Sequence, residues 1–599
     1  MASASPRNTA ALSLPAKGCG IRAAIFLLCS LAGAQAHGTG TATPTDIPGL
    51  RILDANVPAN QVNAVTVGAA GNPPFEPGTS VYEVQTTQPF VAIRSYYSPA
   101  DPAKAGQAGS WISPIAETRG LSRAMQMDRL ALPIYPDGTR NNTFALVLVP
   151  AGVTFWSGPA GPITNSVVPP VGTYWGAGGG IQYYVGRNAG GIPGFQVPRG
   201  NYVLAAPMGE TNLLAYSPRL AGNALAVGRY LEGLDVRAYG DLDRVLTALD
   251  LLNLSTPAAD PRLPRAIAQL GAERHGALGL AALFQSRLFM DQLTAAAGGL
   301  PAADRQVSAA DDQGRRTWAQ VLGARARQSS DGNRTGFTQN TGGFVAGIEL
   351  VRQADWHFGA AAGYLASDLD WADGAPGQGR LKAGYAGAYG RYRQAGWLAS
   401  GQLVAGYGSI DTRRPVAIPD AGLWPGYSFA VERTARASTS AFATGARFDL
   451  AHPLAAGGAT LSPFVGLEYQ RLDRRGFTEE GAGSINLAVR SQTLDDLRLR
   501  LGAALEAPLG PAAALDWSLQ ARLLASHRLG GSAGNLAAGF DGQGGSFPAS
   551  GWRLPDELVQ AGIDWVGRSR NAAVALTYSH DSGKGFEAGT WKATAAWFF

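Results

Sequence analysis

The chain has 599 residues, a formal net charge of +5, 79 glycines and only 16% charged residues. The length predicts more than one domain, and the small net charge gives no basis for nucleic-acid binding. After the N-terminus no run is apolar enough for a transmembrane helix, so the low charge and high glycine content favour a β-rich membrane protein over a cytosolic enzyme.

The placement of cysteine and histidine excludes several kinds of active site. The only cysteines are Cys19 and Cys29, and between Gly38 and Arg274 there is neither Cys nor His. That segment therefore cannot hold a cysteine nucleophile, a Ser-His-Asp triad or a usual His/Cys zinc site. We predict no metal site and no resident cofactor.

Residues 1–36 have the pattern of a secretory signal peptide. Basic residues precede a short apolar run, Ala23–Ala32, and Ala34-Gln35-Ala36 gives the small-x-small pattern of a cleavage site. The run is too short to remain as a membrane anchor. Cleavage after Ala36 would leave a mature chain without cysteine, so no disulfide would stabilise it.

Residues 37–216 form the first predicted domain, which is compact and either α+β or β-rich. Gly and Pro are frequent, and short β-type runs alternate with turn signals. No repeat of fixed period is present, which argues against a stacked β-helix. The predicted strands are Val81–Gln85, Phe90–Tyr96, Phe144–Val149, Ile181–Val185 and Tyr202–Ala205.

Candidate site residues follow one another along this domain. Arg94 lies near the end of an apolar strand, and Trp111 lies in a Gly-Ser-Trp-Ile-Ser-Pro turn. Gly179 and Gly180 belong to a run of three glycines that lets a backbone approach a ligand or adopt a positive φ, and Gln182 follows them on an aromatic strand. In this order the motifs resemble the tuberculosis necrotizing toxin-like family of NAD glycohydrolases.

The resemblance covers residues 81–206 and implies a toxin whose substrate is NAD. Arg94 matches the family's phosphate-binding arginine and Gln182 its catalytic glutamine, so these two are the predicted catalytic residues. Trp111, Tyr183 and the two glycines are the predicted substrate-binding residues. Cleavage of the nicotinamide–ribose bond releases a neutral leaving group, so the site needs to bind the diphosphate and stabilise an oxocarbenium-like state, without a general acid. Some members use a pocket histidine, which this segment lacks.

Two other interpretations of the domain stay open. In a non-catalytic adhesin or surface-binding domain, Arg94 would be a solvated strand-end charge, Trp111 a core aromatic and the glycine run a loop. An ADP-ribosyltransferase would also use Arg94, together with Ser113. It would need a second Glu or Gln two residues from a late glutamate, whereas Glu210 stands alone.

Residues 217–315 change to a helical period of 3.6 and form the predicted linker. Prolines interrupt the pattern, and a long helix rich in Ala and Gly is then predicted from Ala266 to Leu293. Small residues suit a helix that threads a narrow lumen, and a helical bundle or a packed surface helix is the alternative. We expect His275 to be a structural polar residue.

Residues 316–599 contain twelve alternating segments, which predict a 12-stranded outer-membrane β-barrel and a mainly β fold class. In the last segment Trp591 and Trp597 lie on one side of the strand, and Lys592 and Thr594 on the other. A soluble sheet is the alternative, which twelve long strands and a terminal aromatic disfavour. Residues 411–437 and 473–496 are predicted to be outside loops.

Signal peptide, compact domain, helical linker and barrel, in this order, resemble the type V autotransporter family. The resemblance implies the outer membrane of a Gram-negative bacterium, with the N-terminal domain as a passenger at the cell surface or secreted. The implied partners are outer-membrane lipid, the barrel-assembly machinery, periplasmic chaperones, and a host-cell surface or host NAD, but no nucleic acid. Arg391, Arg393, Glu468 and Arg500 are predicted to face the lumen or the interface without a catalytic role.

Overall fold

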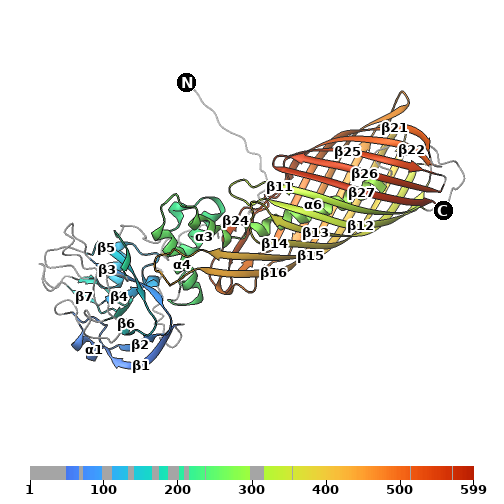
Figure 1. The fold of residues 1–599 in the computed structure, drawn as a ribbon. Coiled ribbons are helices and arrows are strands. Elements are labelled where there is room, and N and C mark those ends of the chain that lie inside the picture. Colours follow the sequence, from blue (N-terminus) through green and yellow to red (C-terminus); the bar gives the residue numbers. More distant parts are fainter. Residues whose placement is uncertain are drawn as a thin grey trace, which may run out of the picture.

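The structure is a computed structural model, and it arranges the chain as a sheet domain, a group of helices and a long barrel in line (Figure 1). The predicted signal peptide, residues 1–36, lies outside the described residues. The structure describes residues 49–66, 72–96, 111–132, 141–164, 174–185, 202–207, 215–236, 238–296, 316–353, 355–512, 515–569 and 571–598.

The N-terminal domain contains one eight-stranded antiparallel sheet, in the order β1-β2-β6-β9-β4-β3-β5-β10. The five predicted strands correspond to β2, β3, β5, β9 and β10, and the β-rich prediction is confirmed. The elements are β1 (Leu50–Pro58), α1 (Ala59–Val65), β2 (Ser80–Thr86), β3 (Phe90–Tyr96), β4 (Trp111–Pro114), α2 (Arg123–Arg129), β5 (Thr143–Val149), β6 (Thr154–Pro159), β7 (Ile163–Thr164), β8 (Tyr174–Gly176), β9 (Ile181–Tyr184) and β10 (Tyr202–Pro207).

Both faces of this sheet are packed. Successive side chains of a strand point to opposite faces, so each strand contributes to two cores. One face gathers residues such as Phe90, Phe155 and Tyr183. The opposite face packs under α1 around Phe75 at one end of the sheet. At the other end it packs against α4 (Asp241–Ser255), around residues such as Leu146.

Four helices connect the two sheets: α3 (Gly222–Glu232), α4 (Asp241–Ser255), α5 (Arg262–Gln269) and α6 (Glu273–Ala296). The prediction of one helix from Ala266 to Leu293 was wrong at its start. The N–H groups of Leu270 and Gly271 bond to the carbonyls three residues earlier, which closes α5 in a tight turn before α6 begins. None of the helices in the described residues has the length and apolar character needed to cross a membrane.

The C-terminal region is a closed antiparallel barrel of twelve strands, as predicted, and β27 pairs with β11 along its whole length to close it. A short strand, β17 (Leu454–Ala456), adds to the edge of β18. The barrel strands are β11 (Arg316–Gln328), β12 (Phe337–Arg352), β13 (Trp356–Trp371), β14 (Gln378–Gln394), β15 (Trp397–Ile418), β16 (Val431–Ala451), β18 (Ala459–Arg474), β21 (Gln492–Ala512), β22 (Leu515–Gly531), β25 (Glu557–Arg568), β26 (Ala572–Gly583) and β27 (Phe586–Phe598).

The predicted outside loops are more ordered than expected. Within residues 411–437, β15 and β16 continue as a long hairpin whose pairing runs to Ile418 and Val431. Within residues 473–496 the chain forms strands β19 and β20, which join β23 and β24 in a separate four-stranded sheet. That sheet packs with α3–α5 in one apolar core, so the helices cover the barrel mouth as a cap. The short strands are β19 (Phe477–Thr478), β20 (Leu487–Val489), β23 (Leu536–Phe540) and β24 (Phe547–Ala549).

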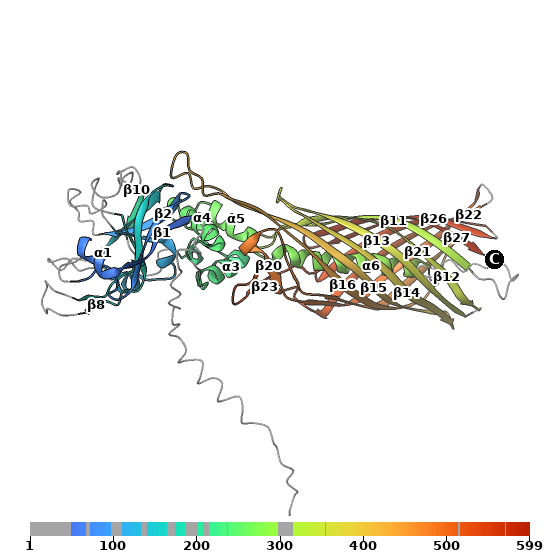
Figure 2. The ribbon, with the colours of Figure 1, turned by 90° about the horizontal axis from the view of Figure 1, so that it is seen from below.

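Side chains of the barrel wall alternate between the outside and the lumen, as predicted from the sequence of the last strand. Trp591 and Trp597 are 57% and 51% exposed on the outside, whereas Lys592 is buried on the inside. Helix α6 runs along the interior of the barrel (Figure 2). Its residues, such as Leu278 and Phe289, share a core with inward-facing wall residues, such as Trp318 and Tyr385. The helix predicted to thread the lumen is therefore confirmed.

Candidate functional site

The residues predicted to form an NAD site lie on neighbouring strands but not on one face of the sheet. Arg94 on β3 alternates with Ile93 and therefore shares the face of Phe90 and Tyr183. Trp111 and Gln182 belong to the opposite face, where Trp111 packs toward α1. The order β9-β4-β3 brings the backbones together, but the two predicted catalytic side chains point to opposite sides.

The polar ends of these side chains bond to the backbone of the domain. Nη1 of Arg94 donates to the carbonyl of Trp111 at 2.7 Å. Nε2 of Gln182 donates to the carbonyl of Pro74 at 2.6 Å, which joins β9 to the segment before β2. In this structure both groups stabilise the connections between strands.

The two aromatic candidates lie in cores. Trp111 packs edge-on against Phe75, with 5.2 Å between ring centroids. Tyr183 is only 1% exposed and packs between Phe155, at 4.6 Å, and Tyr239, at 6.3 Å. Burial raises the pKa of Tyr183 well above its usual range. To stack on a ligand, Tyr183 would have to leave this core.

The glycine run makes a tight turn whose N–H groups are all bonded within the protein. The N–H groups of Gly178, Gly179 and Gly180 donate to the carbonyls of Asp128, Ala160 and Arg129 respectively. Gly178 and Gly179 have φ of +72° and +84°, and a Cβ at Gly180 would lie 2.9 Å from the Arg129 carbonyl oxygen. The glycines are thus required by backbone conformation and close packing. Ser113 is buried on β4, and Glu210 lies outside the described residues.

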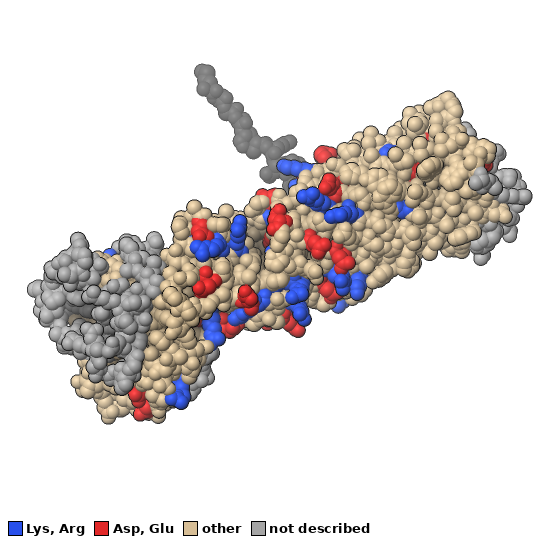
Figure 3. All heavy atoms as spheres, viewed as in Figure 1, with Lys and Arg blue, Asp and Glu red and all other residues tan. Residues whose placement is uncertain are grey.

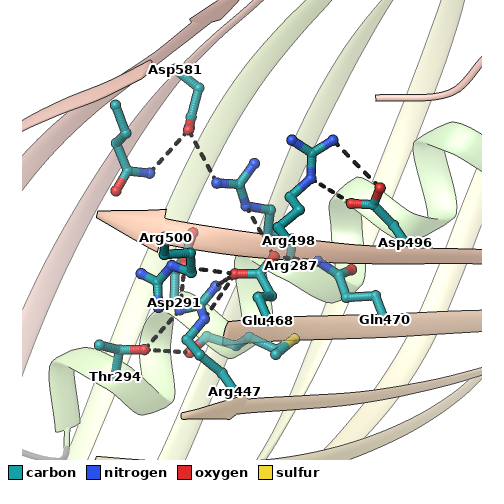
Figure 4. A network of polar contacts seen from close by, with 12 residues as sticks. Arg287, Asp291, Thr294, Arg447, Glu468, Gln470, Asp496, Arg498, Arg500 and Asp581 are labelled. Atoms are coloured by element: carbon teal, nitrogen blue, oxygen red, sulfur yellow. Dashed lines mark hydrogen bonds and ion pairs between the residues drawn. The ribbon is translucent and has the colours of Figure 1, made fainter. Parts of the chain in front are cut away.

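A second group of charged side chains lies in the barrel lumen, where α6 meets the wall (Figure 4). Arg447 on β16 pairs with Glu468 on β18 at 2.6 Å and with Asp291 on α6 at 2.8 Å. Arg287, one helical turn before Asp291, lies 3.6 Å from Glu468 and 3.7 Å from Asp581. Helix and wall are therefore joined by ion pairs on both sides of α6.

Arg500 on β21 extends this network along the wall. It pairs with Asp449 at 2.6 Å and lies 3.7 Å from Glu468. Glu468 and Arg500 face the lumen, in agreement with their prediction as lumen-facing or interfacial residues, whereas Arg287, Asp291 and Asp449 were not predicted. The available signals were Arg287 and Asp291 spaced i, i+4 in an apolar helix, and Asp449 at an inward position of an alternating strand.

Glycines in the wall let the helix approach closely. A Cβ at Gly387 would lie 2.6 Å from Cδ1 of Leu293, and a Cβ at Gly445 would lie 2.6 Å from the sulfur of Met290. The described cavity beside Asp291, lined also by Lys592, has a volume of only about 20 Å³. That is roughly the space of one water molecule. The helix therefore fills the lumen at this level.

The mouth of the lumen is held by a buried carboxylate. Glu479 accepts from Arg414 at 2.9 and 2.5 Å, from Nε2 of His275 at 2.9 Å and from the N–H of Leu487 at 2.9 Å. Burial works against the charge, but Arg414 outweighs it and lowers the pKa of Glu479 to about 2. His275 has the structural role expected for it, because it joins the start of α6 to the cap.

The N-terminal domain docks on α4 through Arg119. This arginine pairs with Asp243 and, at 2.8 Å, with Asp250, and it donates to Oγ1 of Thr247 at 3.1 Å. Tyr216 donates to the other oxygen of Asp250 at 2.5 Å. Burial opposes the charge of Arg119, but the two carboxylates hold its pKa above the usual range.

The tip of the β15–β16 hairpin enters the same interface. Trp424 is 5% exposed and shares an apolar cluster with Ile93, Phe144 and Leu251. Beside it, a cavity of about 540 Å³ separates the N-terminal domain from the hairpin, lined by residues that include Arg244 and Tyr427. Neither Arg119 nor Trp424 was singled out in the sequence, because neither belongs to a periodic pattern.

No cluster of three or more His, Cys, Asp or Glu side chains suited to a metal ion occurs among the described residues.

Comparison with known proteins finds a family model that matches the barrel. Residues 317–585 match the family model described as the Autotransporter beta-domain. No curated protein matches the chain.

Solved structures that resemble the chain include translocation barrels of bacterial autotransporters. The translocator domain of the autotransporter NalP from Neisseria meningitidis is 15% identical, with a TM-score of 0.41, over 53% of this chain and 96% of that one. The beta domain of the Bordetella autotransporter Brka is 16% identical, with a TM-score of 0.34, over 48% and 99%. The transport unit of AIDA-I from Escherichia coli is 12% identical, with a TM-score of 0.31, over 52% and 97%.

Proposed function

We propose that the passenger exported by the outer-membrane barrel, whose residues 317–585 match the Autotransporter beta-domain, stays on the cell surface as a docked, non-catalytic binding domain. The passenger is the N-terminal domain, residues 37–216. The observation that carries the proposal is that contacts hold the chain in two places. One set, the lumen lock, holds α6 inside the barrel, and the other, the outer lock, holds the passenger outside it.

The lumen lock rests on buried ion pairs, whose separation costs free energy. Arg447, Glu468 and Arg287 are all less than 5% exposed. Moving α6 out of the barrel would leave Glu468 and the wall arginines facing each other without Arg287 and Asp291. Breaking one side of a buried ion pair costs about 3–5 kcal/mol. The arrangement therefore favours a helix that stays after export is complete.

The outer lock rests on the passenger's contacts with α4 and the hairpin. Arg119, whose side chain is 12% exposed, pairs with two carboxylates of α4, and Trp424 fills an apolar cluster under the passenger sheet. These contacts hold the passenger at the barrel mouth in addition to the peptide chain that connects the passenger to the barrel. They favour display over release.

The opposite orientation of the two predicted catalytic side chains supports binding over catalysis. Arg94 and Gln182 point to opposite faces of the sheet and bond to backbone carbonyls. NAD cleavage remains the second candidate, because β3, β4 and β9 are adjacent and the Arg94 guanidinium reaches the backbone of Trp111. On this candidate the passenger would be a toxin acting on host NAD.

Display is tested by expressing the full chain in a Gram-negative host and locating the passenger with an antibody. We expect intact cells to be labelled and the passenger to remain in one polypeptide with the barrel in the outer-membrane fraction. Passenger accumulating in the medium as a separate fragment would contradict the proposal.

The binding and enzymatic candidates are separated by measuring NAD loss with the purified full chain. A binding domain leaves NAD intact and adheres to cells or matrix. An NAD glycohydrolase consumes NAD, loses that activity in Gln182→Ala, and keeps it in Gln85→Ala, a matched change on β2. Circular dichroism and protease resistance of each variant show whether the domain is still folded.

A further inference from the structure

A row of side chains crosses five neighbouring strands of the passenger sheet, on the face that α1 partly covers. Side chains of register partners stand next to each other on the same face. The pairings run from β1 through β2, β6 and β9 to β4, and they join Asp54 to Glu83, Glu83 to Trp156, Trp156 to Tyr184 and Tyr184 to Trp111. The row therefore begins with two carboxylates and ends with three aromatic rings.

This row lies directly beside the covered part of the face. One step closer to α1, Phe75 lies over Gly158, where an added Cβ would be 3.0 Å from a ring carbon. In the row itself Glu83 and Trp156 are only partly buried, and Asp54 is exposed. The hairpin tip and α4 pack at the other end of the sheet, and α1 lies on the side of the passenger away from the barrel (Figure 1, Figure 2). The passenger dock therefore leaves the row uncovered.

The aromatic part of the row exposes ring surface and a free donor. Trp156 and Tyr184 are stacked, with 5.9 Å between ring centroids and 15° between ring planes, and Trp111 on the next strand lies 4.9 Å from Tyr184. Tyr184 is only 9% exposed, whereas the two tryptophans are partly exposed. Among the described residues the indole N–H of Trp156 has no hydrogen-bond partner. A ligand on this row thus meets apolar rings with a polar group at their edge.

The polar part of the row combines acceptors and donors. Asp54 and Glu83 are direct register partners, a position at which like charges are destabilising. Glu83 has no hydrogen bond or ion pair with any described residue, and Asp54 accepts only from the N–H of Asn56, at 3.0 Å. In the next row Arg51 gives one N–H to Gln85 at 2.6 Å and has no other partner in the described part of the chain. Figure 3 shows acidic and basic groups near each other at the lower edge of the passenger, where β1 runs in Figure 1, so both signs of charge are available together.

We propose that this face binds a neutral oligosaccharide, with Arg51, Asp54, Glu83, Trp111 and Trp156 as its contacts. The proposal rests on the proposed role of the passenger as a binding domain and names the class of its ligand. A sugar ring has a C–H face that packs on aromatic rings, and hydroxyl groups that both donate and accept. Its hydroxyls can donate to Glu83 and accept from Arg51, whereas a simple cation or anion would satisfy only one of these two groups.

The test uses the purified full chain in detergent and an immobilised panel of neutral oligosaccharides built from glucose, galactose and N-acetylglucosamine. We expect wild type to bind members of the panel, and Glu83→Gln to bind them about tenfold more weakly, because it replaces a charged acceptor and keeps the shape. Trp156→Ala should lose at least about as much, since aromatic anchors dominate many binding surfaces. Trp156→Phe keeps a ring and should bind better than Trp156→Ala.

A matched control changes another glutamate of the same domain. Glu76→Gln alters an exposed side chain just before β2 and should bind as wild type does. Protease resistance of each variant verifies that the passenger is folded. Failure of wild type to bind any member of the panel, or equal binding by wild type, Glu83→Gln and Trp156→Ala, would overturn the proposal.

A second arm identifies the source of the sugar and separates this proposal from the binding role on which it rests. Binding to host cells that periodate oxidation of their glycans abolishes supports a host sugar, and binding to purified lipopolysaccharide supports a bacterial one. Host-cell binding that survives periodate and is equal in Glu83→Gln would overturn the sugar site and leave the binding role standing. NAD consumption by the same preparation would contradict the binding role itself.

Discussion

The barrel and the passenger are both antiparallel sheets, yet their sequences specify them differently. Each barrel strand has lipid on one side and the lumen on the other, so β11 alternates regularly between exposed and buried positions. The passenger sheet is packed on both faces, and β5 is buried at almost every position. In the barrel, alternation therefore shows whether a side chain faces lipid or the lumen. In the passenger, it does not show whether a side chain belongs to a binding site or to a packed core.

The largest expected effect tests whether ion pairs on the inward face of the barrel stabilise it more than ion pairs on the outward face. Glu468→Ala would leave Arg447, Arg287 and Arg500 without their shared carboxylate, and we expect it to lower the free energy of unfolding by about 5 kcal/mol. Urea unfolding followed by heat-shift electrophoresis measures this. Asp473→Ala, which removes a half-exposed partner of Arg471, should cost under about 1 kcal/mol. Similar losses in both variants would mean that the inward network has no special weight.

The second prediction removes one partner of the ion pairs in the passenger dock. Arg119→Ala would leave Asp243 and Asp250 buried and facing each other, and we expect a loss of about 4 kcal/mol in the docking of the passenger on α4. Limited proteolysis should then cut between passenger and barrel while the barrel stays folded. Arg129→Ala, which breaks the more exposed pair with Glu117, should leave the pattern unchanged. Unchanged proteolysis of the Arg119 variant would show that the dock does not depend on this charge.

The third prediction concerns the part of the barrel that enters the passenger core. Trp424→Ala would create a cavity next to Ile93 and Phe144, with an expected loss of about 3 kcal/mol localised to the interface. Hydrogen exchange of β3 and β5 should increase. Tyr427→Ala, which removes a 38% exposed ring from the same hairpin, is the control and should change exchange little. If both variants behave alike, the hairpin tip is not part of the passenger core.

The most local effect is expected at the barrel mouth, where it depends on pH. The pKa of Glu479 is lowered from 4.5 to about 2, so its stabilising contribution is complete above pH 4.5 and is lost as the pH falls through about 2. Protease sensitivity of the α5–α6 turn should therefore rise in that window. In Glu479→Gln the turn should be sensitive already at neutral pH, with little further change on acidification. A wild-type profile that is flat down to pH 2 would contradict this role for Glu479.

Much of the barrel could be predicted from the sequence because its physical constraints repeat on every strand. Strand number and wall alternation followed from a period of 2, and the presence of a long linker helix from a period of 3.6, whereas its place in the lumen was one of three alternatives. The extended hairpin and the cap could not, because their apolar residues, such as Val416 and Ile485, pack against α3–α5, which are distant in sequence. The partners of Arg447 depend on how strands and α6 are staggered, which local sequence does not encode.

In the passenger the order of motifs was informative about strands but not about which side chains converge. Arg94, Trp111 and Gln182 lie on adjacent strands, as the motif order suggested, but a difference of one residue in register places a side chain on the other face. The glycine run was also compatible with two physical explanations, a backbone that approaches a ligand and a backbone that turns within a loop. Its N–H groups bond to the carbonyls of Asp128 and Arg129 in helix α2 and of Ala160 directly after β6.

The pairing of β27 with β11 has a consequence for the timing of assembly. Arg316 lies opposite Phe598, so the seam joins segments separated by nearly the whole barrel sequence. Such distant pairing carries a high loop-closure cost and is slow to form. A ribosome that stops short of the last strand would leave two unpaired edges and no sealed wall. The wall can therefore close only when both β11 and β27 are present and paired.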